Sequence, residues 1–289
     1  MNKVTRLKYY IESLCIYDFE DDDVFSALYD LLCDDEEDTV ALQSYFFKEL
    51  AKSESLKRHI SRLILTNDNI FTKAACAGKV NELSIAVINA VKSDLAKLEE
   101  IASLTAQDIL ADIDDEDIKE ILLTLPGWEV GKPLAPLDSH WDRQLDELIK
   151  YHRENGYGIY AKNIAFTWRD EEITPVNSID PIRLTDLKNY ELQRNKVIDN
   201  TESFIAGHPA NNVLLYGDRG TGKSSTVHAI LNEYWQKGLR MIEIPKSAVA
   251  DLSLIREQIA DSPMKFIIYI DDLSLSLIHI SEPTRPLYI

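Results

Sequence analysis

Apolar residues recur at helical spacing through the first 125 residues, and acidic runs separate the apolar stretches. Three such stretches follow residues 21–23, residues 34–38 and Leu83. Their apolar positions are Val24, Phe25, Leu28, Leu31 and Leu32, then Leu42, Tyr45, Phe46 and Leu50, then Ile85, Ile88, Val91, Leu95, Leu98 and Ile101. Spacings of three and four residues give a helix one apolar face. We therefore predict an acidic helical domain over residues 1–125, with the third stretch running from Leu83 to Ile113.

The acidic runs themselves have two possible readings. Acids at helix starts complement the helix dipole and cap free N–H groups. Calcium loops would need the D-x-[DN]-x-[DN]-G spacing, which none of these runs has. We therefore interpret the runs as helix N-termini, and the domain as a possible adaptor for a partner that the sequence does not name.

Proline and glycine interrupt the pattern after this domain, as is typical of a connector. Within a connector over residues 126–180 we predict a helix from about Trp141 to His152 and a strand from Tyr160 to Trp168. His140 and His152 have no partners at metal-ligand spacing in the sequence, so we interpret them as ordinary surface or packing residues.

Short continuous apolar runs characterise the next region, residues 181–274. Three of them, residues 213–216, 239–244 and 266–270, have the length of buried strands. Apolar positions at helical spacing follow the first two runs. This order of strand, helix, strand, helix, strand predicts an α/β fold with a parallel sheet, beside the N-terminal all-helical domain.

Composition narrows the class of protein. The chain has 289 residues, 45% of them hydrophobic, and a net charge of −18. Residues 1–150 hold 31 acids and 16 bases, a net charge of −15. Such an acidic chain is a poor non-specific binder of nucleic acid. Three scattered cysteines and the absence of an apolar run of roughly 18 residues favour a cytoplasmic protein without a membrane span.

A glycine-rich motif lies directly after the first apolar run. Its eight residues are Gly217, Asp218, Arg219, Gly220, Thr221, Gly222, Lys223 and Ser224. They fit G-x-x-x-x-G-K-[ST], in which loop amides and a helix N-terminus cradle phosphates. We predict that Lys223 reaches the β- and γ-phosphates of ATP and that Ser224 ligates Mg²⁺, with Ser225 beside them in the nucleotide site. A chance glycine-rich turn is the alternative.

Two carboxylates, Asp271 and Asp272, end the third apolar run. Ligands in open α/β sheets bind at the carboxyl ends of the strands. We therefore predict that Asp271 holds Mg²⁺ together with Ser224, and that Asp272 polarises the attacking water in a hydrolysis reaction. Solvated acids at a strand end are the alternative.

From Leu184 onward the chain resembles the AAA+ ATPase superfamily, and most closely a bacterial family of predicted ATPases that carries a label of unknown function. The residues that carry the resemblance are 187–190, 211–225 and 266–274. It implies that Leu187 and Tyr190 lie near adenine, that the sheet has the strand order 5-1-4-3-2, and that the protein forms a homo-oligomeric ring. Asp272 departs from the wider superfamily, in which most members have glutamate at this position.

The last residues change in character. Residues 275–285 resemble one reading frame of an adaptor used in sequencing libraries. We therefore expect residues 275–289 to be foreign to the natural protein, with a divergent natural C-terminus as the alternative. The resemblance then implies that a fourth strand, a sensor residue, an arginine finger and a lid are missing, and that this chain would not turn over ATP although an intact parent would.

The expected function is ATP binding and Mg²⁺-dependent hydrolysis that remodels an unidentified target. One alternative is a DNA-associated helicase loader or transposon helper, against which the net charge argues. Another is a module that binds nucleotide without hydrolysing it, which the shorter Asp272 leaves open.

Overall fold

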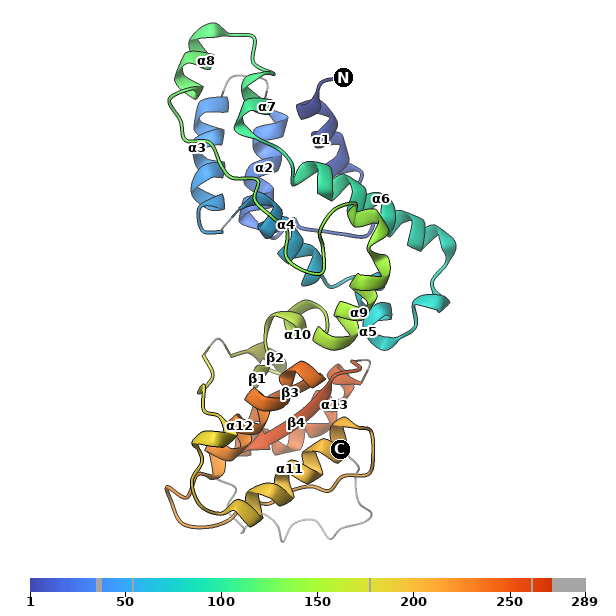
Figure 1. Cartoon of the computed structure of the whole chain (residues 1–289), viewed down its shortest axis with the longest axis vertical. Coiled ribbons are helices and arrows are strands. Elements are labelled where there is room, and N and C mark those ends of the chain that lie inside the picture. The colour runs from blue at the N-terminus through green and yellow to red at the C-terminus, as the bar shows by residue number, and fades with distance from the viewer. Residues whose placement is uncertain (35–37, 54, 177, 261, 272–289) are drawn as a thin grey trace. The chain divides into compact units, whose positions relative to one another are not determined.

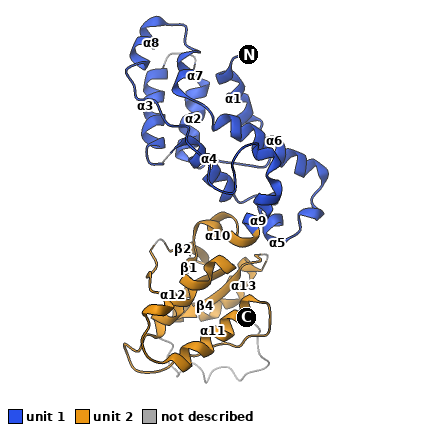
Figure 2. Ribbon diagram, in the orientation of Figure 1, with its two compact units in different colours: residues 1–152 blue, residues 153–289 orange. Residues whose placement is uncertain are grey.

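The computed structural model describes residues 1–34, 38–53, 55–176, 178–260 and 262–271 (Figure 1). Asp272 and the predicted foreign segment 275–289 lie outside the described residues. The chain divides into two compact units, residues 1–152 and 153–289, which Figure 2 colours separately. Across the described residues, every helix is too short or too polar to span a lipid bilayer.

The first unit is built of helices, as predicted. They are α1 (Lys3–Glu12), α2 (Asp23–Cys33), α3 (Thr39–Leu50), α4 (Leu56–Leu65), α5 (Ile70–Ala77), α6 (Ile85–Ile101), α7 (Ala106–Leu110), α8 (Glu116–Leu122) and α9 (Leu145–Asn155), whose last residues belong to the second unit. Short 3-10 turns, η1 (Val80–Glu82) and η2 (Trp141–Arg143), lie between them. One continuous apolar core joins the helices, with Leu28, Phe46 and Leu95 fully buried.

Acidic residues cap two of these helices in the predicted manner. The Asp22 carboxylate accepts a bond from the Phe25 amide at the start of α2, and Asp115 does the same for α8. The stretch from Leu83 to Ile113, however, is not one helix. It ends at Ile101 and restarts at α7, because Thr105 and Asp108 form a reciprocal capping box that begins a new helix there.

The predicted connector is divided between the two units. Its first part packs on the helices: the amides of Leu56 and Lys57 donate to the carbonyls of Glu129 and Val130, at 3.1 and 2.9 Å. Trp141 is fully buried in the helical core. The Pro- and Gly-rich composition indicates loop structure correctly, but apolar side chains within it attach the loop to one unit. Residues from Arg153 onward belong to the second unit.

The second unit is a mixed α/β fold with a four-stranded sheet, so the predicted fold class is confirmed. Its helices are α10 (Gly158–Lys162), α11 (Glu191–Ile205), α12 (Lys223–Tyr234) and α13 (Leu252–Ile259), with 3-10 turns η3 (Leu184–Asp186), η4 (Trp235–Lys237) and η5 (Lys246–Asp251). Its strands are β1 (Ala165–Arg169), β2 (Glu172–Pro175), β3 (Leu239–Ile244) and β4 (Lys265–Ile270), in the order β2-β1-β3-β4. β1 pairs with β3 and β3 with β4 in parallel, and β2 is antiparallel to β1.

Two strand predictions were wrong in part or in full. The segment predicted as a strand from Tyr160 to Trp168 starts as α10 and becomes strand only at Ala165. Residues 213–216 form no strand, and Tyr216 is 88% exposed. A strand needs a neighbour for its backbone groups, and within the described residues the sheet ends at β4. β4 is the edge strand of the described sheet, and Phe266 is its one buried residue, so the prediction of a strand buried on both faces was wrong.

Candidate functional site

The glycine-rich loop leads directly into helix α12, as the motif predicts. Gly222 is the residue before the helix and has φ 81°, and Gly220 has φ 83°. Residues other than glycine rarely adopt these left-handed backbone angles. The two glycines therefore let the loop curl around the N-terminus of α12, where backbone N–H groups and the helix dipole favour an anion.

Lys223 is the first residue of α12, and its ammonium group turns back over the loop. It donates to the carbonyl oxygens of Gly217 and Asp218, at 3.0 and 2.9 Å. The Thr221 hydroxyl also donates to the Asp218 carbonyl, at 2.9 Å. The ammonium group of Lys223 is thus held by exposed carbonyl oxygens. A phosphate could replace these carbonyls as the acceptor, and the bond would be stronger because both partners would then be charged.

Ser224 and Asp271 meet although 47 residues separate them in the sequence. The Ser224 hydroxyl, in the first turn of α12, lies 3.4 and 3.5 Å from the two carboxylate oxygens of Asp271, just past the end of β4. A hydroxyl and a carboxylate are hard oxygen ligands of the kind that Mg²⁺ prefers. The two residues predicted to hold the metal are therefore neighbours, and their chemistry fits that ion.

Tyr269 is a component of this site that the sequence analysis missed. It lies two residues before Asp271, and alternate residues of a strand share one face. Its ring packs edge-on against that of His228, with centroids 6.2 Å apart. Burial raises the pKa of the Tyr269 phenol to about 12, and the neighbouring Asp271 adds to the rise. The signal was available in the alternation of the strand, combined with His228 lying one turn beyond Ser224.

The predicted adenine contacts are placed less clearly. Tyr190 precedes α11 and is 57% exposed, and the carbonyl of Leu187 accepts a bond from Arg194 at 2.6 Å. The residues just before them are anchored by Asn232, which donates to the carbonyls of residues 180 and 182. Asn232 lies about two helical turns along α12 from Ser224. These contacts attach residues 180–182 to a part of α12 that lies away from the glycine-rich loop. The role of Leu187 and Tyr190 at adenine therefore remains a prediction.

A family model described as Protein of unknown function (DUF815) matches residues 161–279. The match covers less than half of the chain, and it includes the glycine-rich loop and Asp271. No curated protein and no solved structure matches the chain. The predicted likeness to a family of unknown function is therefore confirmed for this region, and the family description assigns it no activity.

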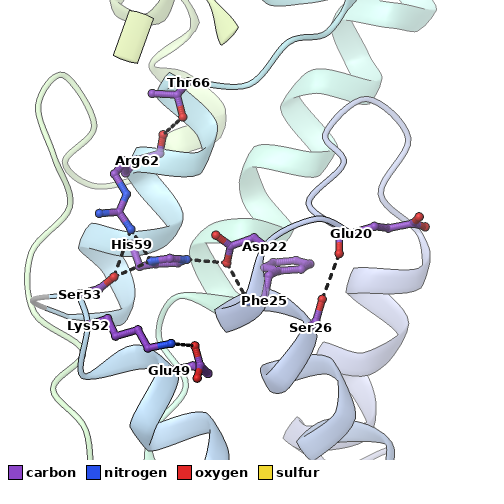
Figure 3. A network of polar contacts seen from close by, with 10 residues as sticks. All are labelled: Glu20, Asp22, Phe25, Ser26, Glu49, Lys52, Ser53, His59, Arg62 and Thr66. Carbon is purple, nitrogen blue, oxygen red and sulfur yellow. Dashed lines mark hydrogen bonds and ion pairs between the residues drawn. The ribbon is translucent and has the colours of Figure 1, made fainter. Parts of the chain in front are cut away.

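A second polar cluster, in the helical unit, contains a serine, a histidine and an aspartate (Figure 3). The ring of His59 lies 2.8 Å from the Ser53 hydroxyl through Nδ1 and 2.7 Å from Asp22 through Nε2. Arg62, however, approaches the same Nδ1 at 2.7 Å. Because an arginine can only donate, it occupies the lone pair that a general base would need. We therefore interpret this cluster as a buried connection between α2 and α4 and not as a nucleophile site.

The electrostatics of Asp22 agree with that interpretation. Partial burial by itself would raise the pKa of this carboxyl, but the bonds from His59 and from the Phe25 amide outweigh burial and lower the pKa. His59 is only 3% exposed. The ionised form of Asp22 is thus the form that the folded helices favour.

Proposed function

We propose that the sheet unit binds ATP with Mg²⁺ at residues 217–224 and hydrolyses it as part of an AAA+-type module. The observation that supports this most directly is the approach of the Ser224 hydroxyl to Asp271 beside the curled loop. These residues bring a helix N-terminus, a lysine and two oxygen ligands to one place. In this proposal hydrolysis drives a conformational change in a homo-oligomer that acts on a target of unknown identity.

Each residue has a distinct role in this proposal. Lys223 leaves the carbonyls of Gly217 and Asp218 and donates to the phosphates, while the loop amides hold the remaining phosphate oxygens. Ser224 and Asp271 hold Mg²⁺, which when bound neutralises charge on the phosphates. Asp272 remains the predicted residue for orienting the attacking water.

The three cysteines of the chain bear on where the protein works. Cys15, Cys33 and Cys76 are not joined in disulfides, and cysteines that stay reduced are typical of a reducing compartment. We therefore propose that the protein acts in the cytoplasm.

The test is the binding of a fluorescent ATP analogue to the full chain, followed by anisotropy with Mg²⁺ or with EDTA. Lys223→Ala should weaken binding about 10- to 100-fold, because a charge-assisted hydrogen bond contributes about 1.5–3 kcal/mol. Asp271→Asn should bind in Mg²⁺ no better than the wild type binds in EDTA. The matched control is Lys196→Ala, which removes an exposed lysine from α11.

Unchanged nucleotide affinity in Lys223→Ala would contradict the binding proposal. Hydrolysis is tested separately, by release of inorganic phosphate from unlabelled ATP. Binding that depends on Lys223 without phosphate release would support a nucleotide-dependent interaction module and would contradict hydrolysis by this chain.

A further inference from the structure

A second set of metal-ligating side chains lies in the helical unit. Glu99 comes from α6, and His140 and Asp142 come from the segment that includes η2. One ligand atom from each lies within 4.8 Å of the other two. We propose that these three residues form a binding site for a divalent transition metal ion, separate from the glycine-rich loop.

The backbone of the loop orients Glu99 toward the other two residues. One carboxylate oxygen of Glu99 accepts from the His140 amide at 2.9 Å, and the other accepts from the Trp141 amide at 3.0 Å. Each oxygen keeps a further lone pair, so both bonds are compatible with metal ligation. Hydrogen bonds of this kind hold ligating carboxylates in many metal sites.

The segment that carries His140 and Asp142 is itself held firmly. Trp141, between the two ligands, is fully buried, and its indole N–H donates to the Asp138 carbonyl at 3.3 Å. The Asp138 amide in turn donates to the Gln144 side chain at 2.9 Å. The tryptophan is therefore anchored in the core, while His140 beside it is exposed and Asp142 is half-buried.

The ligand set indicates which ions the site would take. One imidazole nitrogen and two carboxylate oxygens suit Zn²⁺, Co²⁺ or Ni²⁺ better than they suit Mg²⁺, because Mg²⁺ prefers ligands that are all oxygen atoms. Ligands about 2.1 Å from such an ion lie roughly 3–3.5 Å apart, so the side chains must close by up to roughly 1.5 Å. His140 is exposed and free to make that adjustment. The two carboxylates also balance the charge of a divalent ion.

A bound ion would connect helix α6 to the segment around η2. This segment lies within the predicted connector, and its attachment to α6 otherwise depends on Trp141 and on the Glu99 bonds. Metal binding would therefore stabilise the part of the helical unit from which the chain continues into the sheet unit. No pattern in the sequence reveals this site, because Glu99 is 41 residues from His140.

The test is a titration of the full chain with Co²⁺, followed by visible d–d absorption, and with Zn²⁺, followed by calorimetry. Both are done in an Asp271→Asn background, so that the loop site does not contribute. His140→Asn is the first variant, because asparagine tolerates the left-handed backbone that His140 adopts at φ 55°. Asp142→Asn is the second.

Each variant should weaken metal binding by at least about tenfold, which is the loss that even outer-shell changes cause. His208→Ala, which removes an exposed histidine from the sheet unit, should bind as the background does. Absence of d–d absorption with excess Co²⁺, or equal binding by His140→Asn, would overturn the proposal. A sulfur-to-cobalt charge-transfer band would also overturn it, because it would assign the ion to a cysteine such as the exposed Cys15.

Discussion

The helical unit and the sheet unit each contain one charged side chain that is almost completely buried, and the two charges are opposite. Among the described residues these are Asp94, which is 0% exposed, and Arg240, which is 1% exposed. An isolated buried charge costs several kcal/mol. Both units offset that cost chiefly with backbone groups. Backbone amides surround the buried anion, and backbone carbonyls surround the buried cation.

In the helical unit the backbone supplies donors. One oxygen of Asp94 accepts from three consecutive amides, those of Cys15, Ile16 and Tyr17, at 2.9, 2.7 and 3.3 Å. Lys97 adds a longer ion pair at 3.7 Å. The carboxylate thereby fixes the loop before α2 to helix α6.

In the sheet unit the backbone supplies acceptors. The Arg240 guanidinium donates to four carbonyl oxygens, those of Asn155, Tyr160, Trp235 and Leu239, at 2.6–3.0 Å. These carbonyls belong to the end of α9, to α10, to η4 and to β3 itself. Arg240 thus joins the first helices of this unit to the middle of its sheet.

The anion binding proposed for the glycine-rich loop would resemble the Asp94 site, with one difference. At residues 15–17 successive amides surround a carboxylate that the chain itself provides in the core, and the proposed nucleotide site would use amides in the same way. At residues 217–222 the loop is mostly exposed, and Lys223 rests on its carbonyls. A filled amide site stabilises the fold, whereas a site at the surface is available to a ligand.

Removal of Asp94 should have the largest effect on stability. Asp94→Ala leaves three amides unpaired and should lower the free energy of unfolding of the helical unit by about 3–5 kcal/mol. Urea unfolding followed by circular dichroism measures the change. Lys97→Ala, which removes only the longer ion-pair partner, should cost less than about 1 kcal/mol. Equal losses in the two variants would show that the amides are not the main partners of Asp94.

The matching change in the sheet unit is Arg240→Met, which keeps much of the side-chain volume. It leaves buried carbonyls without their donor and should cost about 3 kcal/mol in unfolding free energy. Arg240→Lys keeps the charge but cannot reach all four oxygens, and it should recover only part of that loss. A fully stable Arg240→Met would indicate that water satisfies these carbonyls.

The His59 cluster gives a smaller and pH-dependent effect. Asp22→Ala removes both a helix cap and the partner of His59, and should cost about 2 kcal/mol near neutral pH. Asp22→Asn keeps the cap, so it should cost about half as much.

The pH dependence follows from the lowered pKa of Asp22. A carboxyl whose pKa is lower in the folded state contributes its stability above the unfolded pKa of about 3.9, and loses it as pH falls through the folded pKa. The difference between wild type and Asp22→Asn should therefore be largest near neutral pH and shrink in acid. Urea unfolding at several pH values checks this, and a difference independent of pH would contradict it.

The smallest effect is expected in the exposed loop. Gly220 has φ 83°, although an added Cβ would meet nothing within 4 Å. Gly220→Ala should therefore cost about 1 kcal/mol through backbone strain alone. Gly127→Ala is the control, because its Cβ would make an ordinary 3.7 Å contact with Ala106 and should be neutral within about 0.5 kcal/mol. Thermal unfolding compares the two.

Local patterns predicted much of this molecule. Strands β3 and β4, helix α12 and the capped start of α2 all follow from apolar spacing and from the chemistry of adjacent residues. The motif also placed Lys223 and Ser224 at the start of α12 correctly. The segment 213–216 failed because its apolar composition fits a strand, while strand formation depends on a neighbour that no local pattern supplies.

The candidate site shows the same limit. Asp271 was predicted beside Ser224 from the rule for parallel strands, and the described structure brings them together. Tyr269 was missed because the apolar run was taken as uniform, without asking which residues shared a face with Asp271. Glu99 was missed because its partner His140 lies in a different segment of the chain.

By itself, the sequence determined helices α2, α3 and α12, two of the strands, the curled loop and the chemistry of the residues that line it, because these depend on spacings within a few residues. Tertiary structure alone decided that the connector residues around Trp141 join the helical core, that 213–216 remains unpaired, and which buried backbone groups surround Asp94 and Arg240. The physical reason is that burial and pairing depend on residues far apart in the chain, and their positions follow only from packing of the whole unit.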